Sequence, residues 1–503
     1  MTPALRRIAF CAVMAFALVL RLGDFNRPYT QAGWQHMNAT FAIMARNYLE
    51  RGYLATKLAP VTDIGPVSGR DYQAFLHHPP LFPLLISLCF QVFGVCEWSA
   101  RLLPIVASLA QLVLTMLIAR RLFGGTEAWL ALAVTAAVPA CSFYGSHVCE
   151  LGSVVMAFAT LAFWLALRYL EAPSARRLVA VCAAALLASM TDWPGVYMSG
   201  CLFLLLLVKR RPRAALAIAG TMVFLAVEHL LHHVIATGSL RGGRGGSLAQ
   251  VFAQRSYGGF DRVGGVDTAA AAIVRHLCSH YATPVLAAAA VGLVLLRRAR
   301  DPASGIALIV AGVAHTAIFP EGAARHDFWN ITWAPVVAVL CANGVVGATR
   351  WVPPRARTAI ACGCALGVMA FGAVRTPARF RSIEDSYCYE LGSLLHDHTE
   401  PGAMILSCEN SFDPLRYYAA RAIAGPQRDE ALARFGGEIP PEFEQSGYRY
   451  FVIPEISYTQ HRGESAPHHH DQLLKLLSTR YQQRILASPA CGAVHLFDLR
   501  EKR

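Results

Sequence analysis

The feature that most constrains this chain is a succession of apolar runs, each roughly 17–25 residues long, that begins at the N-terminus and stops near residue 375. A helix of that length crosses the roughly 30 Å of hydrocarbon in a bilayer. Hydrophobic residues make up 55% of the 503 residues and charged residues only 15%, which is too apolar for an ordinary soluble protein. The sequence therefore predicts a polytopic α-helical membrane protein with a soluble final quarter.

The basic residues follow a regular pattern between these runs. Short clusters, such as Arg120-Arg121 and Lys209-Arg210-Arg211, occur in every second loop. Such loops stay in the cytoplasm, so they explain the formal net charge of +13 without a nucleic-acid partner. The pattern predicts a multi-pass protein of a bacterial inner membrane, with a cytoplasmic N-terminus and a periplasmic C-terminal domain. About eleven spans are expected, at residues 7–23, 98–119, 127–145, 151–169, 178–193, 195–208, 213–234, 282–296, 304–320, 331–348 and 358–375.

Two long polar segments, residues 24–97 and 235–281, are expected on the outer side. Connections of that length are uncommon unless they build a site. Within the first, apolar residues at helical spacing predict two helices lying in the membrane interface, at residues 38–50 and 80–93. The short turn Asp192-Trp193-Pro194 is interpreted as structural.

The domain boundary is expected near residue 375. Residues 1–375 form the transmembrane domain, and residues 376–503 form a small periplasmic α/β domain, because helical and strand-like patterns alternate there. Its predicted elements are helices at residues 384–397, from Pro414 and at 470–479, and strands at 403–407, 448–453, 482–487 and 493–499.

Three stretches of the membrane part together carry a resemblance. Residues 45–53 read Ala-Arg-Asn-Tyr-Leu-Glu-Arg-Gly-Tyr, residues 77–81 read His-His-Pro-Pro-Leu, and residues 93–102 read Phe-Gly-Val-Cys-Glu-Trp-Ser-Ala-Arg-Leu. Together with the layout of spans, they resemble the glycosyltransferase C superfamily. The resemblance is to the bacterial relatives of protein O-mannosyltransferases and aminoarabinose transferases, of glycosyltransferase family 39 type, and it extends over residues 1–375.

The resemblance implies an activity: inverting transfer of a hexosyl or pentosyl group from a polyprenyl-phosphate donor to a hydroxyl acceptor at the outer membrane face. The acceptor would be a lipid, a glycan or a protein. An acidic residue of the first outer loop would deprotonate the acceptor, since a sugar hydroxyl is a poor nucleophile. A basic group or a divalent metal ion would balance the departing phosphate. The sequence leaves open whether a metal takes part.

The sequence departs from this pattern at the expected acid. No carboxylate lies between Asp24 and Glu50. The candidate bases are then His36, Asp63 and Asp71 from the same loop, Asp24 from the end of the first span and Glu150 from the next outer turn, with His36 and Glu150 favoured. The alternative is that Asn38 replaces the acid and the chemistry has been lost or changed.

Basic residues on the outer side are candidates for binding the donor phosphate. Each set also has a structural interpretation: a helix start at Pro79-Pro80, a solvated aromatic turn, or a mobile glycine-rich loop. The candidates are His77, His78, Arg241, Arg244, Arg325 and His326.

Two other classes of function compete with the enzyme. A transporter or flippase of lipid-linked solutes would be expected to show repeated halves and polar residues in mid-membrane, which this sequence lacks. A catalytically silent relative that binds polyprenyl phosphate fits the missing carboxylate.

Overall fold

The computed structural model describes residues 3–64, 74–76, 78–149, 151–238, 252–253, 255–408, 412–424, 447–462 and 470–502. The chain divides into two compact units. A helical unit contains residues 1–26, 51–60 and 74–382, and a mixed unit contains residues 27–50, 61–73 and 383–503. The mixed unit therefore gathers half of the first polar segment together with the C-terminal segment, and each unit is described by itself.

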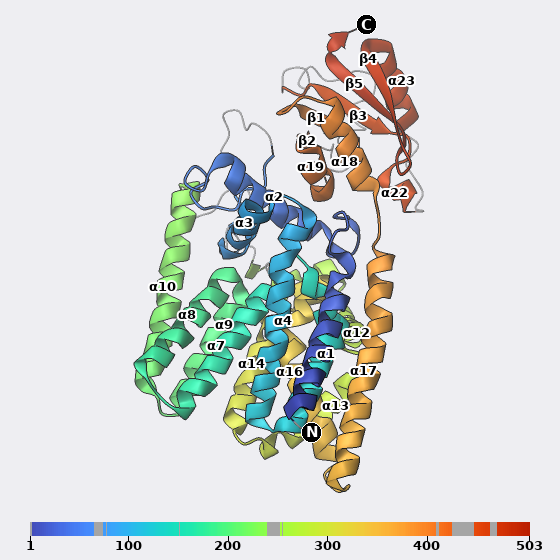
Figure 1. Cartoon of the computed structure of the whole chain (residues 1–503). Coiled ribbons are helices and arrows are strands. Elements are labelled where there is room, and N and C mark those ends of the chain that lie inside the picture. Colours follow the sequence, from blue (N-terminus) through green and yellow to red (C-terminus); the bar gives the residue numbers. More distant parts are fainter. Residues whose placement is uncertain are drawn as a thin grey trace. The chain divides into compact units, whose positions relative to one another are not determined.

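Each of the eleven predicted ranges coincides with a helix of the helical unit (Figure 1). Six described helices are long and apolar enough to cross a membrane, and two bent pairs raise the number to eight. The other three helices, α8, α9 and α14, contain 17, 16 and 17 residues. The helices are α1 (Pro3–Arg21), α4 (Glu97–Leu122), α5 (Gly125–Ala137), α7 (Ser153–Glu171), α8 (Ala175–Thr191), α9 (Trp193–Val208), α10 (Pro212–Thr237), α13 (Thr283–Val294), α14 (Pro302–Ile318), α16 (Ala334–Ala348) and α17 (Pro354–Ser382).

Both bent pairs break where the backbone cannot continue as a helix. Between α5 and the short helix α6 (Pro139–Ser142), the chain turns by 64° at Val138, because Pro139 has no N–H for the helix. The buried Arg21 side chain donates to the carbonyls of Ala136 and Thr135, at 3.2 and 3.4 Å. The arginine thus satisfies oxygens that the end of α5 leaves without helical partners.

The second break corrects the prediction that residues 235–281 form a loop. Residues 266–281 are helix α12 (Val266–Tyr281), which bends by 102° into α13. Ala282 lies at the bend with a left-handed φ of 65°, and Pro284 starts the next helix. Polar residues at the start of this segment masked the helical spacing that follows.

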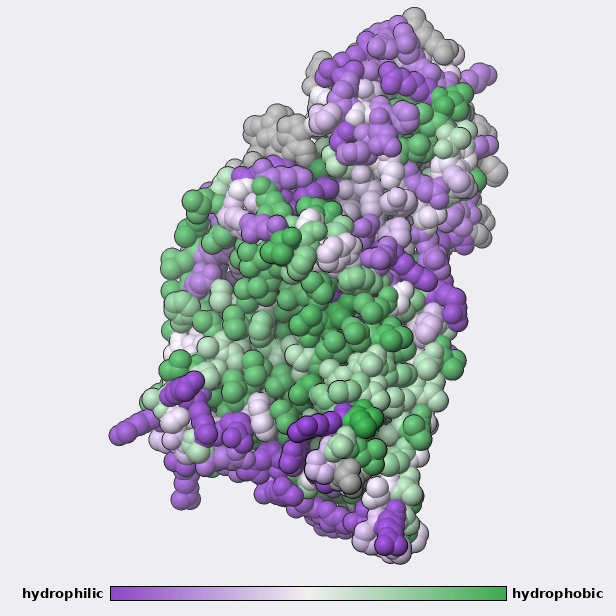
Figure 2. Space-filling view, in the orientation of Figure 1, coloured by the Kyte–Doolittle hydropathy of each residue, from purple (hydrophilic) through white to green (hydrophobic). Residues whose placement is uncertain are grey.

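Helices α13 and α16 approach each other at glycines. A Cβ atom on Gly292 would lie 1.8 Å from the Leu340 carbonyl oxygen, and one on Gly344 would lie 1.9 Å from that of Ala288. Small residues allow this contact between backbones, as is common in membrane helices. Figure 2 shows a broad hydrophobic surface over the helical unit, bordered by hydrophilic residues at the end that carries the N-terminus.

The helical unit has two polar ends that differ in composition. We call the first the arginine-rich end; it contains Arg120, Arg121, Arg168, Lys209 and Arg297, where α4, α7, α9 and α13 finish. We call the opposite one the histidine-rich end; it contains His78, His229, His315 and His326. Short elements gather at the second end: α3 (Leu81–Phe93), η3 (Tyr144–Ser146), η4 (Tyr257–Val263), α15 (Pro320–Arg325) and η6 (Asp327–Trp333).

The mixed unit contains a five-stranded sheet in the order β2-β1-β3-β5-β4. Strand β1 (Met404–Ser407) pairs in parallel with β2 (Ala422–Ala424) and β3 (Tyr450–Pro454). Strand β5 (Gly492–Lys502) runs antiparallel to β3 and to β4 (Tyr481–Ser488). The prediction of an α/β tail is confirmed in its main elements, whereas β2 and the short helix α22 (Tyr458–His461) were missed.

Side chains of β3 alternate between two apolar cores, as the period of two requires. Tyr450 and Val452 join a core with helix α18 (Tyr387–His398), whereas Phe451 and Ile453 join a core that includes Leu477 of helix α23 (His470–Arg480). The sheet is therefore covered on both faces.

The first-loop helix α2 (His36–Arg51) is present, but it is not the half-exposed interface helix that was predicted. All eleven residues from Asn38 to Tyr48 are buried. Arg46 donates to the Tyr417 carbonyl at 3.0 Å and lies over the ring of that tyrosine, on helix α19 (Asp413–Ala419). A contact with a segment some 370 residues away in sequence thus decides how this helix is buried.

Candidate functional site

The histidine-rich end is organised around a pair of side chains from distant segments. The Nδ1 atom of His78 lies 2.6 Å from an oxygen of Asp192, whose side chain is only 1% exposed. A carboxylate only accepts hydrogen bonds, so Nδ1 carries the proton. The ring also stacks on Phe75, with centroids 5.5 Å apart. His78 is therefore fixed in position, while 19% of its side chain stays exposed.

His315 and Tyr197 extend this group from neighbouring helices. Their rings lie 5.9 Å apart, and both side chains interact electrostatically with Asp192. His315 is 2% exposed, and neither of its ring nitrogens has a hydrogen-bond partner among the described residues. The Asp192 turn, which was interpreted as structural, is thus the centre of a buried polar group.

The predicted pair Arg325 and His326 lies at the same end, but the two side chains differ in role. His326 is buried and stacks on Trp329 at 5.2 Å, and its Nε2 accepts a hydrogen bond from Arg255. The Arg255 guanidinium also covers the Trp329 ring, 5.4 Å from its centroid. Arg325 is half exposed and lies 3.9 Å from the buried carboxylate of Glu321.

A second network holds the turn that carries His326. Arg379 of α17 donates to the Tyr144 hydroxyl at 2.6 Å and to an Asp327 oxygen at 2.5 Å. His280, which is fully buried, lies 3.5 Å from the same oxygen of Asp327. The Asp327 carboxylate, next to His326, thus links side chains from four elements: α12, α17, η3 and η6.

In the mixed unit, His36 lies near a carboxylate that comes from the C-terminal segment. The Thr40 hydroxyl donates to Asp413, and Asp413 forms an ion pair with Arg416 at 3.1 Å. Burial lowers the pKa of His36, and the charge of Asp413 offsets part of that effect. The sequence lacks an acid beside His36, but the fold supplies Asp413 there.

The remaining predicted residues divide into two sets. The Asp63 carbonyl accepts a hydrogen bond from Asn47 at 2.9 Å, which fixes the backbone at that position. Asp24, at the end of the first span, forms a buried ion pair with Arg101 at 3.2 Å. Five predicted residues lie outside the described residues: Asp71, His77, Glu150, Arg241 and Arg244.

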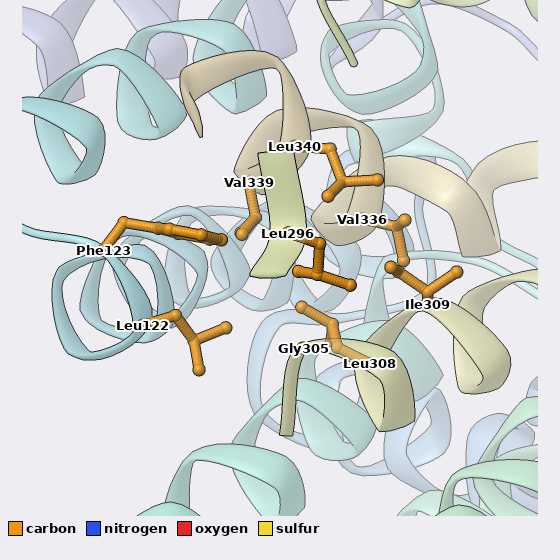
Figure 3. Close-up of a pocket in the computed structure, with 9 residues that line it drawn as sticks. All are labelled: Leu122, Phe123, Leu296, Gly305, Leu308, Ile309, Val336, Val339 and Leu340. Atoms are coloured by element: carbon orange, nitrogen blue, oxygen red, sulfur yellow. The ribbon is translucent and has the colours of Figure 1, made fainter. Parts of the chain in front are cut away.

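A metal site would require several donor side chains that lie close together. Within the described ranges, no three His, Cys, Asp or Glu side chains are placed to hold a metal ion. A small pocket between α4, α14 and α16, near the arginine-rich end, is lined only by apolar residues and Gly305 (Figure 3). That pocket offers no group for acid-base chemistry, so the candidate site stays at the histidine-rich end.

Comparison with solved structures defines the class of protein. The chain is similar to ArnT from Cupriavidus metallidurans bound to undecaprenyl phosphate, with a TM-score of 0.69 and 13% identity over 99% of this chain and 98% of that one. It is also similar to the apo oligosaccharyltransferase of Archaeoglobus fulgidus, with a TM-score of 0.56 and 14% identity over 96% of this chain and 74% of that one. The protein is therefore a multi-pass integral membrane protein with an ArnT-like fold.

A family comparison narrows this class. Residues 77–233 match the family of dolichyl-phosphate-mannose-protein mannosyltransferases. The resemblance to this group of glycosyltransferases, predicted from the sequence, is thereby confirmed. No curated protein matches the chain. The matched segment begins at the histidine pair and contains His78 and Asp192.

Several residues of the site were not singled out in the sequence, although it carried signals for some of them. Arg379 follows the last predicted span on the side that is expected to be outside, where the positive-inside rule does not call for an arginine. Glu321 is an acid in an otherwise apolar turn. No local signal marked Tyr144 or Asp413, because their partners are far away in sequence.

Proposed function

We propose that the protein transfers a sugar from a polyprenyl-phosphate donor to a hydroxyl acceptor at its histidine-rich end. The observation that carries the proposal is the His78–Asp192 pair, which lies inside the family-matched segment of an ArnT-like fold. ArnT in the similar structure is bound to undecaprenyl phosphate. A lipid-linked donor also explains why the polar groups gather at the ends of membrane helices.

The donor phosphate would be held by His78, Arg255, Arg325 and His326. When the bond between sugar C1 and the phosphate oxygen breaks, the lipid phosphate gains a negative charge. A guanidinium fixed over Trp329 and the imidazolium form of His78, fixed by a buried carboxylate, are preorganised donors for that charge. Because they are already in place, they need little reorganisation during the reaction.

Among the candidates for the acceptor base that the structure describes, we favour His36. Its lowered pKa keeps the imidazole neutral near pH 7, which is the form that accepts a proton. The acceptor oxygen would bond to C1, its proton would pass to the acceptor base, and the polyprenyl phosphate would leave. Inversion at C1 follows from a single displacement. Asp63, Asp71 and Glu150 are the other candidates.

We also propose that α8, α9 and α14 cross the membrane. At 1.5 Å per residue they extend about 24–26 Å, close to the lower limit for a span. The protein would then have eleven spans in a bacterial inner membrane, with the arginine-rich end in the cytoplasm. The domain boundary near residue 375 would separate this part from a periplasmic C-terminal domain.

The test uses the purified protein in proteoliposomes with undecaprenyl-phosphate sugars and lipid, glycan or protein acceptors. We expect sugar to leave the lipid and undecaprenyl phosphate to appear, with and without a chelator compared in parallel. Glu127→Gln is the control, since Glu127 is buried in the first turn of α5 at the arginine-rich end. Movement of the donor across the bilayer without transfer would favour a flippase, and binding without transfer would favour a silent relative, as the missing first-loop carboxylate suggests.

A further inference from the structure

Three side chains of neighbouring elements carry buried polar atoms that lack a hydrogen-bond partner among the described residues. These atoms are the Tyr197 hydroxyl, both ring nitrogens of His315 and both carboxylate oxygens of Glu321. His315 is 2% exposed and Glu321 is 0% exposed. Leaving such a group unsatisfied in the protein interior is unfavourable. Folded proteins rarely contain several such unsatisfied polar groups close together unless the groups have a function.

The ion pair of Glu321 does not account for its burial. The nearest Arg325 nitrogen is 3.9 Å away, which is too long for a hydrogen bond, and Arg325 is 52% exposed. The carboxylate therefore keeps its capacity to accept hydrogen bonds.

Aromatic rings bring these polar groups together. The His315 ring lies 4.8 Å from Trp329, and Phe319 lies 6.3 Å from Tyr197 and 6.1 Å from Trp329. Gly322 holds Glu321 next to Trp329, because a Cβ at that position would lie 2.0 Å from the indole ring. Residues of α9, α14, α15 and η6 thus converge around one indole.

We propose that Tyr197, His315, Glu321 and Trp329 form a recognition site for the sugar of the donor, an inference that rests on the proposed function. A sugar presents a C–H face that packs on an aromatic ring, and hydroxyl groups that donate to a carboxylate and exchange hydrogen bonds with imidazole and phenol. A phosphate does not fit, since Glu321 repels it. A polyprenyl chain does not fit either, since it leaves every polar atom unsatisfied.

The experiment separates sugar recognition from phosphate binding. The protein in nanodiscs is titrated with undecaprenyl phosphate and with an undecaprenyl-phosphate sugar that the wild type uses. For Glu321→Gln, His315→Leu and Tyr197→Phe, we expect binding of the sugar-bearing lipid to weaken about 10-fold, which corresponds to one lost hydrogen bond in a buried site. Binding of undecaprenyl phosphate should stay within about twofold, which also verifies that each variant is folded.

Two controls define the outcomes. His78→Ala should weaken both lipids equally, because it removes a phosphate contact away from Trp329, and Glu127→Gln should change neither. If the Glu321, His315 and Tyr197 variants leave the ratio of the two affinities at its wild-type value, the recognition site is wrong while the proposed function stands. If the wild type uses none of the sugar-bearing lipids, the proposed function itself fails.

Discussion

Two ion pairs of equal length lie at opposite ends of the helical unit. His78 and Asp192 are 2.6 Å apart at the histidine-rich end, and Lys209 and Asp301 are 2.6 Å apart at the arginine-rich end. The Asp301 oxygens are occupied, because they also accept from the Ser304 amide at 3.2 Å and the Ser304 hydroxyl at 2.7 Å and so cap α14. The second oxygen of Asp192 has no hydrogen-bond partner in the described part of the chain.

The comparison teaches that the distance within an ion pair does not distinguish structure from function. What differs is the capacity of the carboxylate to accept further hydrogen bonds after the chain has folded. At the arginine-rich end, charges are exposed and paired with each other: Glu171 lies 3.1 Å from Arg168, and these side chains are 30% and 47% exposed. At the histidine-rich end, polar groups are buried with part of their hydrogen-bonding capacity unused, as expected for groups that await a substrate.

Removing the pair at the histidine-rich end is the sharpest test of this difference. We expect His78→Ala or Asp192→Asn to lower the rate of sugar transfer about 10²–10³-fold, since a fixed imidazole beside the leaving phosphate is lost. The double variant should be little worse than either single variant, because the two residues act as a unit. Lys209→Ala should leave transfer within about twofold. Equal losses from both pairs would remove the distinction between the ends.

The network around Arg379 tests whether buried charges at the histidine-rich end also hold the fold. Arg379→Gln leaves the carboxylate of Asp327 without its guanidinium partner, so we expect about 3 kcal/mol of lost stability. Thermal unfolding in detergent measures the loss. Tyr144→Phe removes only one hydrogen bond from the same network and should cost about 1 kcal/mol. If Arg379→Gln unfolds at the same temperature as the wild type, the ion pair between Arg379 and Asp327 does not contribute to stability.

The pair at the arginine-rich end should affect stability only, and in a pH-dependent manner. Burial raises the pKa of Asp301, but hydrogen bonds from Lys209 and Ser304 outweigh burial, and the pKa is lowered. The stabilisation is therefore complete above the pKa of the unfolded chain and is lost as the pH falls through the folded value. Asp301→Asn should cost about 0.5–1 kcal/mol at pH 7, because it removes the charge that pairs with Lys209, while the asparagine can still cap α14. Melting curves from pH 3 to 7 should show a weaker pH dependence in this variant, with unchanged transfer at pH 7.

Much of the fold could be predicted because its signals are local. Each apolar range contains a helix, since a segment in hydrocarbon must satisfy its own backbone groups. The continuous apolar run of β3 likewise predicted a strand buried on both faces. The break at Pro139 was missed, because the apolar run continues through it, and helix α12 before Ala282 was missed, because its segment starts with polar residues.

Single residues of the candidate site could be predicted from the sequence, but their pairings could not. His78, Arg325 and His326 could be selected, because polar residues beside apolar spans usually belong to a site. Their partners Asp192, Glu321 and Arg255 could not be assigned, since each pairing depends on how the helices pack. His36 shows the same limit: Asp413, the acid whose charge acts on it, is 377 positions later in the chain.

The sequence by itself determined that this chain spans a membrane, which end of its helices carries the arginines, and the group of glycosyltransferases that it resembles. These properties depend on composition and spacing, which act within one segment at a time. The tertiary structure alone decided which carboxylate holds His78, which acid lies near His36, and which polar atoms stay buried without partners. Such choices depend on contacts between residues far apart in the chain, and those contacts exist only after the helices have packed.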